Sequence, residues 1–471
     1  MNRVPVLLFR FILTIAVCAA TPGWAADSAV PQTVQCDKPA QKGPLTPGAL
    51  RDRLRAHQAW LEQRDSPGHR RADLCGADLR RAALEDANLE RAKLEGTNLQ
   101  QANLRRSILT QALLAGADLT KAVLEDSNLV GADLRRAKLA HANLMRVVGD
   151  EAALFNAVLA GAQLHDSIFE RGHFEGADLQ AADLTNATLV DSYFYGANLR
   201  GAVLNGADLM GADLRRTVLS KAAMLQTNLQ GALLDGARLD HTRMLETDLE
   251  SAYLDDADLR HATIMDAILR GADMRHADLE GATLSQSDLE GANLEQARLR
   301  KTSFKSAKLR MAILYKAVVD QADFRGANLH HAVLIGTRGT DTVFTKAVLD
   351  EIYAPKVSLP RAQFDDAVLD SANLVSADLG GANFRHALLA NANLQEANLQ
   401  GADFNGADLS HARLDAADLR AARLHGANLA TATGVTQAQL DTACIDEHTQ
   451  LPSDLRRPAP CPPAVKKAAK R

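Results

Sequence analysis

The sequence predicts an all-β solenoid, a β-helix in which each coil has four sides. Two periodicities predict this fold. From Leu74 to Leu429 every fifth residue is a large apolar one, and the exceptions are Gly149, Gly339 and Ala354. Phenylalanine then recurs at intervals of four such units, at Phe304, Phe324, Phe344, Phe364, Phe384 and Phe404. A period of five fits neither an α-helix nor a β-strand, so the chain must turn regularly and return to the same side after four units.

The composition agrees with narrow, repeated coils. Aromatic residues are only 4% of the chain, fewer than a conventional core of 471 residues would use. A small residue, such as Ala72 or Ala77, stands two places before each large apolar one, and Asp or Asn usually lies between them. We expect the large and the small residue to point inward and the other three outward. The formal net charge is −5, without a basic patch in the repeats, which argues against nucleic-acid binding.

Units such as Ala117-Asp118-Leu119 and Ala142-Asn143-Leu144 follow the pattern A-(D/N)-L-x-x. This pattern resembles the pentapeptide-repeat family, and the resemblance covers residues 72–433. It implies a right-handed quadrilateral β-helix, here of about eighteen coils spaced ~4.8 Å apart. It also implies that no catalytic activity need be present, since most members of the family have none known.

Two stretches of the repeat look irregular. The motif weakens over 147–151, and residues 335–360 contain Gly336, Gly339, Pro355 and Pro360. The phase of the repeat is nevertheless kept, because the phenylalanine spacing continues across the second stretch. We therefore expect bulged, degenerate coils there and no inserted loops.

Both ends of the repeat are expected to carry a short helical cap, because an open β-helix exposes unpaired backbone. In the N-terminal segment 26–71, Thr46 and Pro47 predict the start of a helix over about 47–63. Its apolar face would hold Leu50, Leu54, His57, Trp60 and Leu61. At the other end, Thr436 predicts a capping helix within 434–450 that runs to about Cys444, with Leu440 facing the last coil. A basic tail, 451–471, follows.

Residues 1–25 have the pattern of a signal peptide. Arg3 precedes a short apolar run, and Gly23-Trp24-Ala25 predicts cleavage after Ala25. The alternative is an uncleaved anchor. A signal peptide predicts a periplasmic or secreted protein, as in a Gram-negative bacterium.

The four cysteines that would remain after cleavage predict two local disulfides. Cys75 belongs to the first coil and Cys444 follows the last, so they lie far beyond the ~7 Å Cα separation that a disulfide allows. The tail after Cys444 is too short to bring Cys461 back to Cys75. We therefore expect Cys36–Cys75 and Cys444–Cys461, in agreement with an oxidising compartment. A metal site is the alternative, and the absence of CxxC spacing disfavours it.

We find no catalytic motif and no cofactor motif in the sequence. Asp and Glu fall mostly at outward repeat positions, where a solvated surface explains them. His241 and His261 occupy the same place on consecutive coils, close enough to share a metal, but no third ligand is evident. The sequence therefore predicts no metal site and no enzyme.

One surface feature is a candidate interaction stripe. Leu225, Leu245 and Met265 each follow an inward residue and should point outward on adjacent coils. Stacked exposed apolar side chains can mark a contact with a partner or with another copy. Ordinary drift of a surface column is the alternative.

These observations favour an envelope or secreted scaffold that presents flat faces to a protein partner. A second hypothesis comes from the resemblance, because some pentapeptide-repeat proteins mimic DNA and bind gyrase. Export disfavours it, and so does the mixed charge of the column that holds Arg200, Asp240 and Arg260. Carbohydrate or cell-wall binding is a third hypothesis, with weak support from Phe155, Tyr195 and Tyr315, which share a column but lie coils apart. After removal of the signal peptide, no membrane insertion and no nucleic-acid partner are expected.

Overall fold

The computed structural model describes residues 45–63 and 70–458, all within one compact unit, Cys36–Arg471. Within these residues there are four elements, α1 (Pro47–Glu62), β1 (Arg243–Leu245), β2 (Thr263–Met265) and α2 (Gln437–Leu440). Neither described helix is long and apolar enough to cross a bilayer. The expected signal peptide, with cleavage after Ala25, lies outside the described residues.

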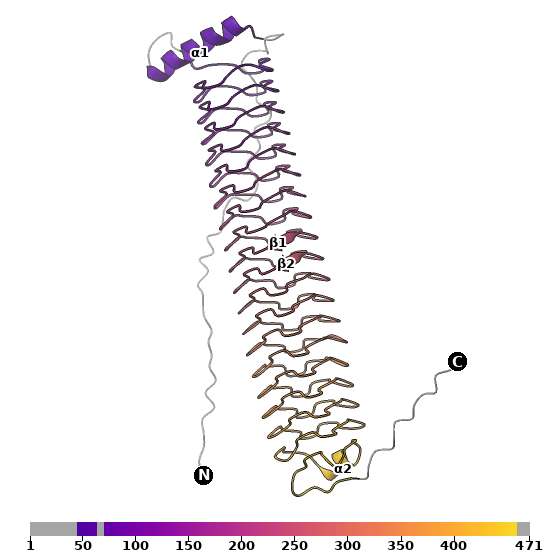
Figure 1. Cartoon of the computed structure of the whole chain (residues 1–471). Coiled ribbons are helices and arrows are strands. Elements are labelled where there is room, and N and C mark those ends of the chain that lie inside the picture. The colour runs from indigo at the N-terminus through magenta and orange to yellow at the C-terminus, as the bar shows by residue number, and fades with distance from the viewer. Residues whose placement is uncertain (1–44, 64–69, 459–471) are drawn as a thin grey trace, which may run out of the picture. The chain divides into compact units, whose positions relative to one another are not determined.

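Most of the chain forms stacked coils held together by single parallel β-bridges (Figure 1). Each bridge joins a residue to the one 20 positions later, from Asp73↔Lys93 to Arg413↔Thr433. The bridging residues are five apart along the chain, so each coil has four sides. The period of five and the return after four units, both predicted from the sequence, are confirmed.

The backbone bonds show why a pentapeptide makes one side. The amide of Leu74 donates to the carbonyl of Lys93 (2.8 Å), and the amide of Lys93 donates to the carbonyl of Ala72 (2.9 Å). The chain then turns, and the amide of Ala77 donates to the carbonyl of Leu74 (3.0 Å). The second turn residue has positive φ, +63° at Gly76, as a type II turn requires.

The interior is a column of buried Leu, Ala and Phe side chains. Phe304 and the five phenylalanines that follow it in its column stack with ring centroids 4.7 to 5.0 Å apart and interplanar angles of 6° or less. The predicted phenylalanine stack is therefore confirmed. The ring separation is close to the strand spacing of a β-sheet, so neighbouring coils place like rings in contact.

The two irregular stretches do not interrupt the stack. Bridges continue as Asn128↔Val148↔Ile168 and as Val318↔Arg338↔Ser358. The absence of inserted loops is confirmed. The expected bulging is not seen in the ladders, which keep the 20-residue register through both stretches.

Neighbouring side chains occupy the space where an inward residue is small. A Cβ added to Gly149 would lie 2.2 Å from the ring of Phe169, one coil later, so that ring already fills the position. At Ala354 the sizes are exchanged instead, because Ile352 takes the place of the usual small residue and is 3% exposed. A small inward residue is thus compensated by a larger side chain beside it, so the interior stays filled although single positions vary in size.

At the N-terminal end, α1 lies against the first coil and corresponds to the helix expected over about 47–63 (Figure 1). The Thr46 side chain accepts a hydrogen bond from the amide of Ala49 (3.3 Å), and Pro47 opens the helix. Leu50 and His57 are buried, and His57 Nδ1 accepts from the amide of Ala72 (3.0 Å).

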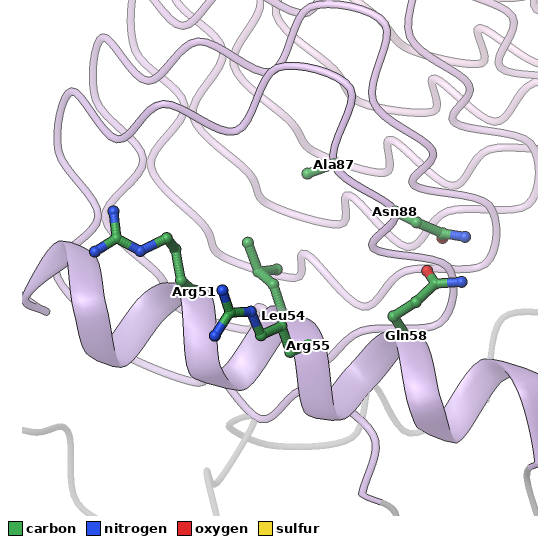
Figure 2. A pocket seen from close by; sticks show the side chains of 6 residues that line it. All are labelled: Arg51, Leu54, Arg55, Gln58, Ala87 and Asn88. Carbon is green, nitrogen blue, oxygen red and sulfur yellow. The ribbon is translucent and has the colours of Figure 1, made fainter.

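A shallow hollow separates part of α1 from the first coil (Figure 2). Its lining consists of Arg51, Leu54, Arg55, Gln58, Ala87 and Asn88. Leu54 points from the helix toward the coil and packs against the core, whereas Gln58 lies beside Asn88.

At the C-terminal end the expected helix is shorter than predicted. It is α2 (Gln437–Leu440), with Thr436 and Gln439 forming a capping box and Leu440 fully buried. It does not run to Cys444, because the chain returns to the coil and Cys444 bridges Arg423, followed by Asn428↔Gln450. The segment after α2 thus adds a last, partial coil in a shifted register.

Candidate interaction surfaces

The predicted stripe of Leu225, Leu245 and Met265 lies at one corner of three consecutive coils. Leu245 and Met265 are direct partners in the pairing of β1 with β2. Leu225 is 40% exposed and the other two are half-buried. The structure therefore brings these side chains together, and whether they contact a partner stays a prediction.

The corner beneath the stripe differs from the regular turns. The turn bond is lost from Thr247 to Met244 and from Ala267 to Ile264, whereas the chain keeps its turn between Met224 and Thr227 without a well-formed bond there. The Thr247 hydroxyl donates instead to the carbonyl of Met224 (2.6 Å), one coil earlier. The corner opens, and the bridges of two coils lengthen into β1 and β2.

The edge of the stripe is polar. Gln226 Nε2 donates to Glu246 Oε2 (2.8 Å), and Asp266 lies at the equivalent place on the next coil. The Leu225 amide donates to Asn205 Oδ1 (2.9 Å). The stripe is therefore narrow, with carboxylates along one side.

A larger surface, which the sequence interpretation missed, lies on another side of the coils. We call it the tyrosine face. It consists of the bridge residues in the ladder from Asp73 to Thr433 together with the turn residues two positions later. All five tyrosines of the chain belong to it, namely Tyr193, Tyr195, Tyr253, Tyr315 and Tyr353.

The first apolar block of the tyrosine face is an aromatic cluster. His173 stacks between Phe155 (5.0 Å between centroids) and Tyr193 (4.8 Å). The Arg215 and Arg216 guanidinium groups lie 6.0 and 5.8 Å from the centre of the Tyr195 ring. Contacts between bridge residues and turn residues show that both columns share one surface.

The second apolar block follows farther along the same face. Its members are Ile313, Tyr315, Val333, Ile335, Tyr353 and Pro355, on three consecutive coils. Tyr353 is 48% exposed and Ile313 is 37% exposed. The other four side chains are half-buried. A stacked, partly exposed apolar group of this kind can mark a contact surface.

Charged groups lie between the two blocks. Arg215 pairs with Asp213 (2.6 Å) and Arg275 with Asp273 (2.8 Å). His276 Nδ1 lies 2.8 Å from Asp255 Oδ1, and this hydrogen bond raises the pKa of His276. Burial raises the pKa of the Asp235 carboxyl.

The tyrosine face can be recognised in the sequence when two neighbouring columns are considered together, and a single column shows only part of it. Phe155, Tyr195 and Tyr315 belong to one turn column, whose support for a binding surface is weak by itself. The neighbouring bridge column holds Tyr193, Tyr253 and Tyr353. Because the two columns are adjacent within the 20-residue coil, their aromatic residues form one cluster.

Within residues 45–63 and 70–458, one group has ligand atoms close enough together for a metal ion: Asp255, Asp256 and His276. Its members are half-buried or exposed. The His241 and His261 rings lie 5.1 Å apart, as their spacing predicted, and His241 also lies 3.4 Å from Asp240. A third ligand for this pair is not present among the described residues.

Cys75 and Cys444 are both disulfide-bonded in the structure. The expected partners, Cys36 and Cys461, lie outside the described residues. The pairing Cys36–Cys75 and Cys444–Cys461 therefore stays a prediction.

Comparison with known proteins identifies the repeat. The family model described as pentapeptide repeats matches eleven segments between residues 70 and 433, which are 70–106, 107–146, 157–194, 177–216, 192–231, 212–250, 242–281, 277–314, 322–352, 356–385 and 397–433. A search of the curated proteins finds no match.

Several solved structures are similar to this chain. HetL from the cyanobacterium Nostoc sp. strain PCC 7120, a pentapeptide-repeat protein involved in the regulation of heterocyst differentiation, is 29% identical, with a TM-score of 0.17, over 54% of this chain and 91% of HetL. A pentapeptide-repeat protein of the Arabidopsis thaliana thylakoid lumen is 27% identical, with a TM-score of 0.10, over 29% of this chain and 67% of that protein.

QnrB1, a plasmid-mediated fluoroquinolone resistance protein, is 19% identical over 44% of this chain and 92% of QnrB1, with a TM-score of 0.23. At such low TM-scores no property of these proteins is carried over to this chain. The family match, the four-sided coil and the five-residue side lead to the same result. The chain belongs to the pentapeptide-repeat family and has its fold, the right-handed quadrilateral β-helix.

Proposed function

We propose that this protein is a non-enzymatic interaction or scaffold protein, periplasmic or secreted, which presents a flat face of its β-helix to a protein partner. In this proposal about eighteen coils, spaced ~4.8 Å apart, form the platform, and α1 and α2 cap its two ends. The signal peptide predicted over residues 1–25 supports the location. The family membership agrees with a role in binding.

The observation that carries the proposal is the tyrosine face. Tyrosine is enriched at protein interfaces because its ring contributes large apolar area while its hydroxyl tolerates water. All five tyrosines of the chain lie on this one side of the coils, and Tyr193, Tyr195, Tyr253 and Tyr353 are each at least 39% exposed. The backbone behind them is held by bridges on every coil, so little order has to be imposed when a partner binds.

A protein partner fits this face better than a glycan. Sugar rings pack against the open faces of aromatic side chains. In the first block the ring faces are already in contact with each other, His173 with both Phe155 and Tyr193. The ring faces that His173 shares with Phe155 and Tyr193 are therefore closed to a sugar ring.

Gyrase binding by DNA mimicry is the alternative, and it needs a strongly negative face. The column with Arg200, Asp240 and Arg260 does not supply one, and Arg260 is paired with Asp258 (2.7 Å). Inhibition of gyrase by the purified protein would favour this alternative over the proposal.

Crosslinking in the producing cell tests the proposal. The wild-type chain is compared with a tyrosine-face variant that carries Tyr193→Lys, Tyr253→Lys and Tyr353→Lys. We expect the mature protein in the periplasmic or secreted fraction, and we expect the face variant to lose the crosslinked species. Lysine at these places removes apolar area and is depleted at interfaces.

The matched control places three lysines on the opposite side of the coils, as Gln163→Lys, Thr283→Lys and Gln363→Lys, also at bridge positions. A second variant, Leu225→Lys, Leu245→Lys and Met265→Lys, tests the stripe. If the control loses crosslinking as strongly as the face variant, or if neither loses it, the tyrosine face is not the interface.

A further inference from the structure

We infer that the tyrosine face is the contact surface between two copies of this chain, which pack face to face with their coils antiparallel. The two-fold axis crosses the face at Tyr253. The inference rests on the proposed function, because it names the partner of that interaction face.

The apolar blocks are placed symmetrically about Tyr253. Three coils before it lie Tyr193 and Tyr195, and three coils after it lie Ile313 and Tyr315. Five coils before lie Ala153 and Phe155, and five coils after lie Tyr353 and Pro355.

A two-fold axis that lies across the rod, in the plane of the interface, reverses the coil order and keeps each column on itself. It therefore sets Tyr193 against Ile313 and Tyr195 against Tyr315 of the second copy. In the same arrangement Phe155 meets Pro355, and His173 meets Val333. A two-fold interface must be self-complementary in this way.

Two charged pairs of the turn column obey the same symmetry. In the turn column Arg215 lies two coils before the axis and Glu295 two coils after it, so each meets the opposite charge on the second copy. One coil from the axis, Asp235 likewise meets Arg275. Complementary charge sets the register of an interface.

The parallel arrangement fits less well. With its two-fold axis along the bridge ladder, it would place every residue of that ladder opposite itself, and so would set Asp213 against Asp213 and Asp273 against Asp273. The antiparallel arrangement requires the apolar blocks to be spaced symmetrically about Tyr253, and the sequence has this spacing. A parallel arrangement would not require it.

One turn position beside the axis is small. Glycine occupies the second turn position of the preceding corner on the two coils before and the two coils after Tyr253, at Gly211, Gly231, Gly271 and Gly291. The first turn position of the same corner keeps its side chains, as at Met210 and Arg270, so only the glycine column leaves room for the opposite face.

The size of the contact predicts a weak dimer. Ten coil spacings of ~4.8 Å, from Ala153 to Tyr353, span roughly 50 Å, and three extended residues make the face about 10 Å wide. Roughly 500 Å² would be buried on each copy, at the lower limit for specific interfaces. At the axis the carboxylates of Asp255 and Asp256 approach their copies, and Arg275 (3.7 Å) and His276 (2.8 Å) of the same chain counter the charge of Asp255.

Sedimentation equilibrium of the purified mature chain, over a range of concentrations at low salt, tests the self-association. We expect a monomer–dimer equilibrium. The single change Arg215→Glu sets two acidic side chains against each other across the interface, and Glu295→Arg sets two basic ones against each other. Each single change should therefore weaken the dimer by about tenfold or more. The double variant Arg215→Glu/Glu295→Arg restores opposite charges and should recover most of the affinity.

Crosslinking with a short bismaleimide tests the orientation, and the native cysteines serve as the background control in the wild-type chain. The variant Tyr193→Cys/Ile313→Cys should crosslink into a covalent dimer, whereas Ile313→Cys alone should not. Thermal melting of each variant verifies that the β-helix is intact.

Two results would overturn the inference. One is a monomer at every concentration; the other is a dimer in which Ile313→Cys alone crosslinks. If the chain stays monomeric but the lysine variant of the tyrosine face still loses its crosslinked species in the cell, the proposed function stands with a different partner. If the chain stays monomeric and the crosslinked species is unaffected, both fail.

Discussion

At the residue scale, the interior of this β-helix tolerates small inward residues because a neighbour supplies the missing volume. Protein interiors are close-packed, so an empty inward position would cost contacts on all sides. At Gly149 the ring of Phe169 fills the gap from the next coil. At Ala354 the larger Ile352 fills it from the same side of the same coil.

This exchange predicts that restoring the repeat consensus at Gly149 will harm the protein. Gly149→Leu should lower the free energy of unfolding by about 1–3 kcal/mol, because the new side chain meets the Phe169 ring. Phe169→Leu alone should also destabilise, since it leaves a void. Chemical denaturation of both single variants and of the double variant measures the effect.

In the double variant Gly149→Leu/Phe169→Leu, each layer holds its own leucine. We therefore expect the double variant to be more stable than the sum of the single effects, by about 0.5–3 kcal/mol of coupling. Strict additivity would show that Phe169 does not occupy the Gly149 layer.

At the element scale, a side-chain hydroxyl takes over from a turn amide at the corner next to β1. The Met224 carbonyl accepts from Thr247 Oγ1, and the Thr227 amide makes no well-formed bond to it although the chain turns there. In the preceding coil the Leu204 carbonyl accepts both from Thr227 Oγ1 (2.7 Å) and from the amide of Ala207 (3.0 Å). The two threonines occupy the same column, but the carbonyl that accepts from Thr227 has a second donor in the Ala207 amide, whereas the carbonyl that accepts from Thr247 has no second well-formed bond.

Thr247→Val should therefore destabilise more than Thr227→Val. The first removes the one well-formed hydrogen bond to the Met224 carbonyl, at a cost of about 1–3 kcal/mol. The second leaves the Ala207 amide in place and should cost about 1 kcal/mol or less. Equal losses in the free energy of unfolding, measured side by side by urea denaturation, would contradict this account of the open corner.

The docking of α1 should depend on pH through His57. This side chain is fully buried, and burial lowers the pKa of its imidazole. The unfolded chain therefore binds a proton at a higher pH than the folded chain does. The contribution of neutral His57 is present above about pH 6.5, the ordinary pKa of histidine, and is lost as the pH falls below it.

Trp60 stacks on His57 with centroids 5.5 Å apart, so its fluorescence reports this contact. We expect the thermal midpoint of the Trp60 signal to fall between pH 7 and pH 5 in the mature wild-type chain. His57→Gln keeps an acceptor for the Ala72 amide and has no proton to bind, so its midpoint should change less. The same pH dependence in both proteins would exclude His57 as the cause.

At the scale of the whole molecule, the disulfides are expected to fasten each end of the repeat locally. Peptide mapping of the non-reduced mature protein should recover Cys36 joined to Cys75 and Cys444 joined to Cys461. Cys75 and Cys444 begin and end the stack of coils, so a long-range pair between them is geometrically excluded. A free Cys75, or a peptide joining Cys75 to Cys461, would refute the local pairing.

Also at this scale, the repeat converts a short sequence pattern into long continuous faces. Each side of a coil places its bridge residue above the equivalent residue of the previous coil. Residues separated by many multiples of 20, such as Tyr193 and Tyr353, thus share one surface. This property makes the tyrosine face possible. Because equivalent positions differ by 20 residues, two residues lie at equal distances from Tyr253 along the rod when their numbers differ from its number by the same multiple of 20.

The sequence by itself determined the fold, the phase of the coils between residues 72 and 433, and the start of α1. It could do so because the signals are local: a turn every five residues, a cap at Thr46 and Pro47, and like residues every fourth unit. It also predicted that Leu225, Leu245 and Met265 would lie together, because register follows directly from the period.

Only the tertiary structure decided which contacts form between neighbouring coils. The open corner under β1 and β2, the Phe169 ring in the Gly149 layer and the early end of α2 all depend on contacts between coils, which no single pentapeptide specifies. The tyrosine face emerged in the same way. Bridge and turn columns form separate series along the chain, and they make one surface because their side chains meet across neighbouring coils.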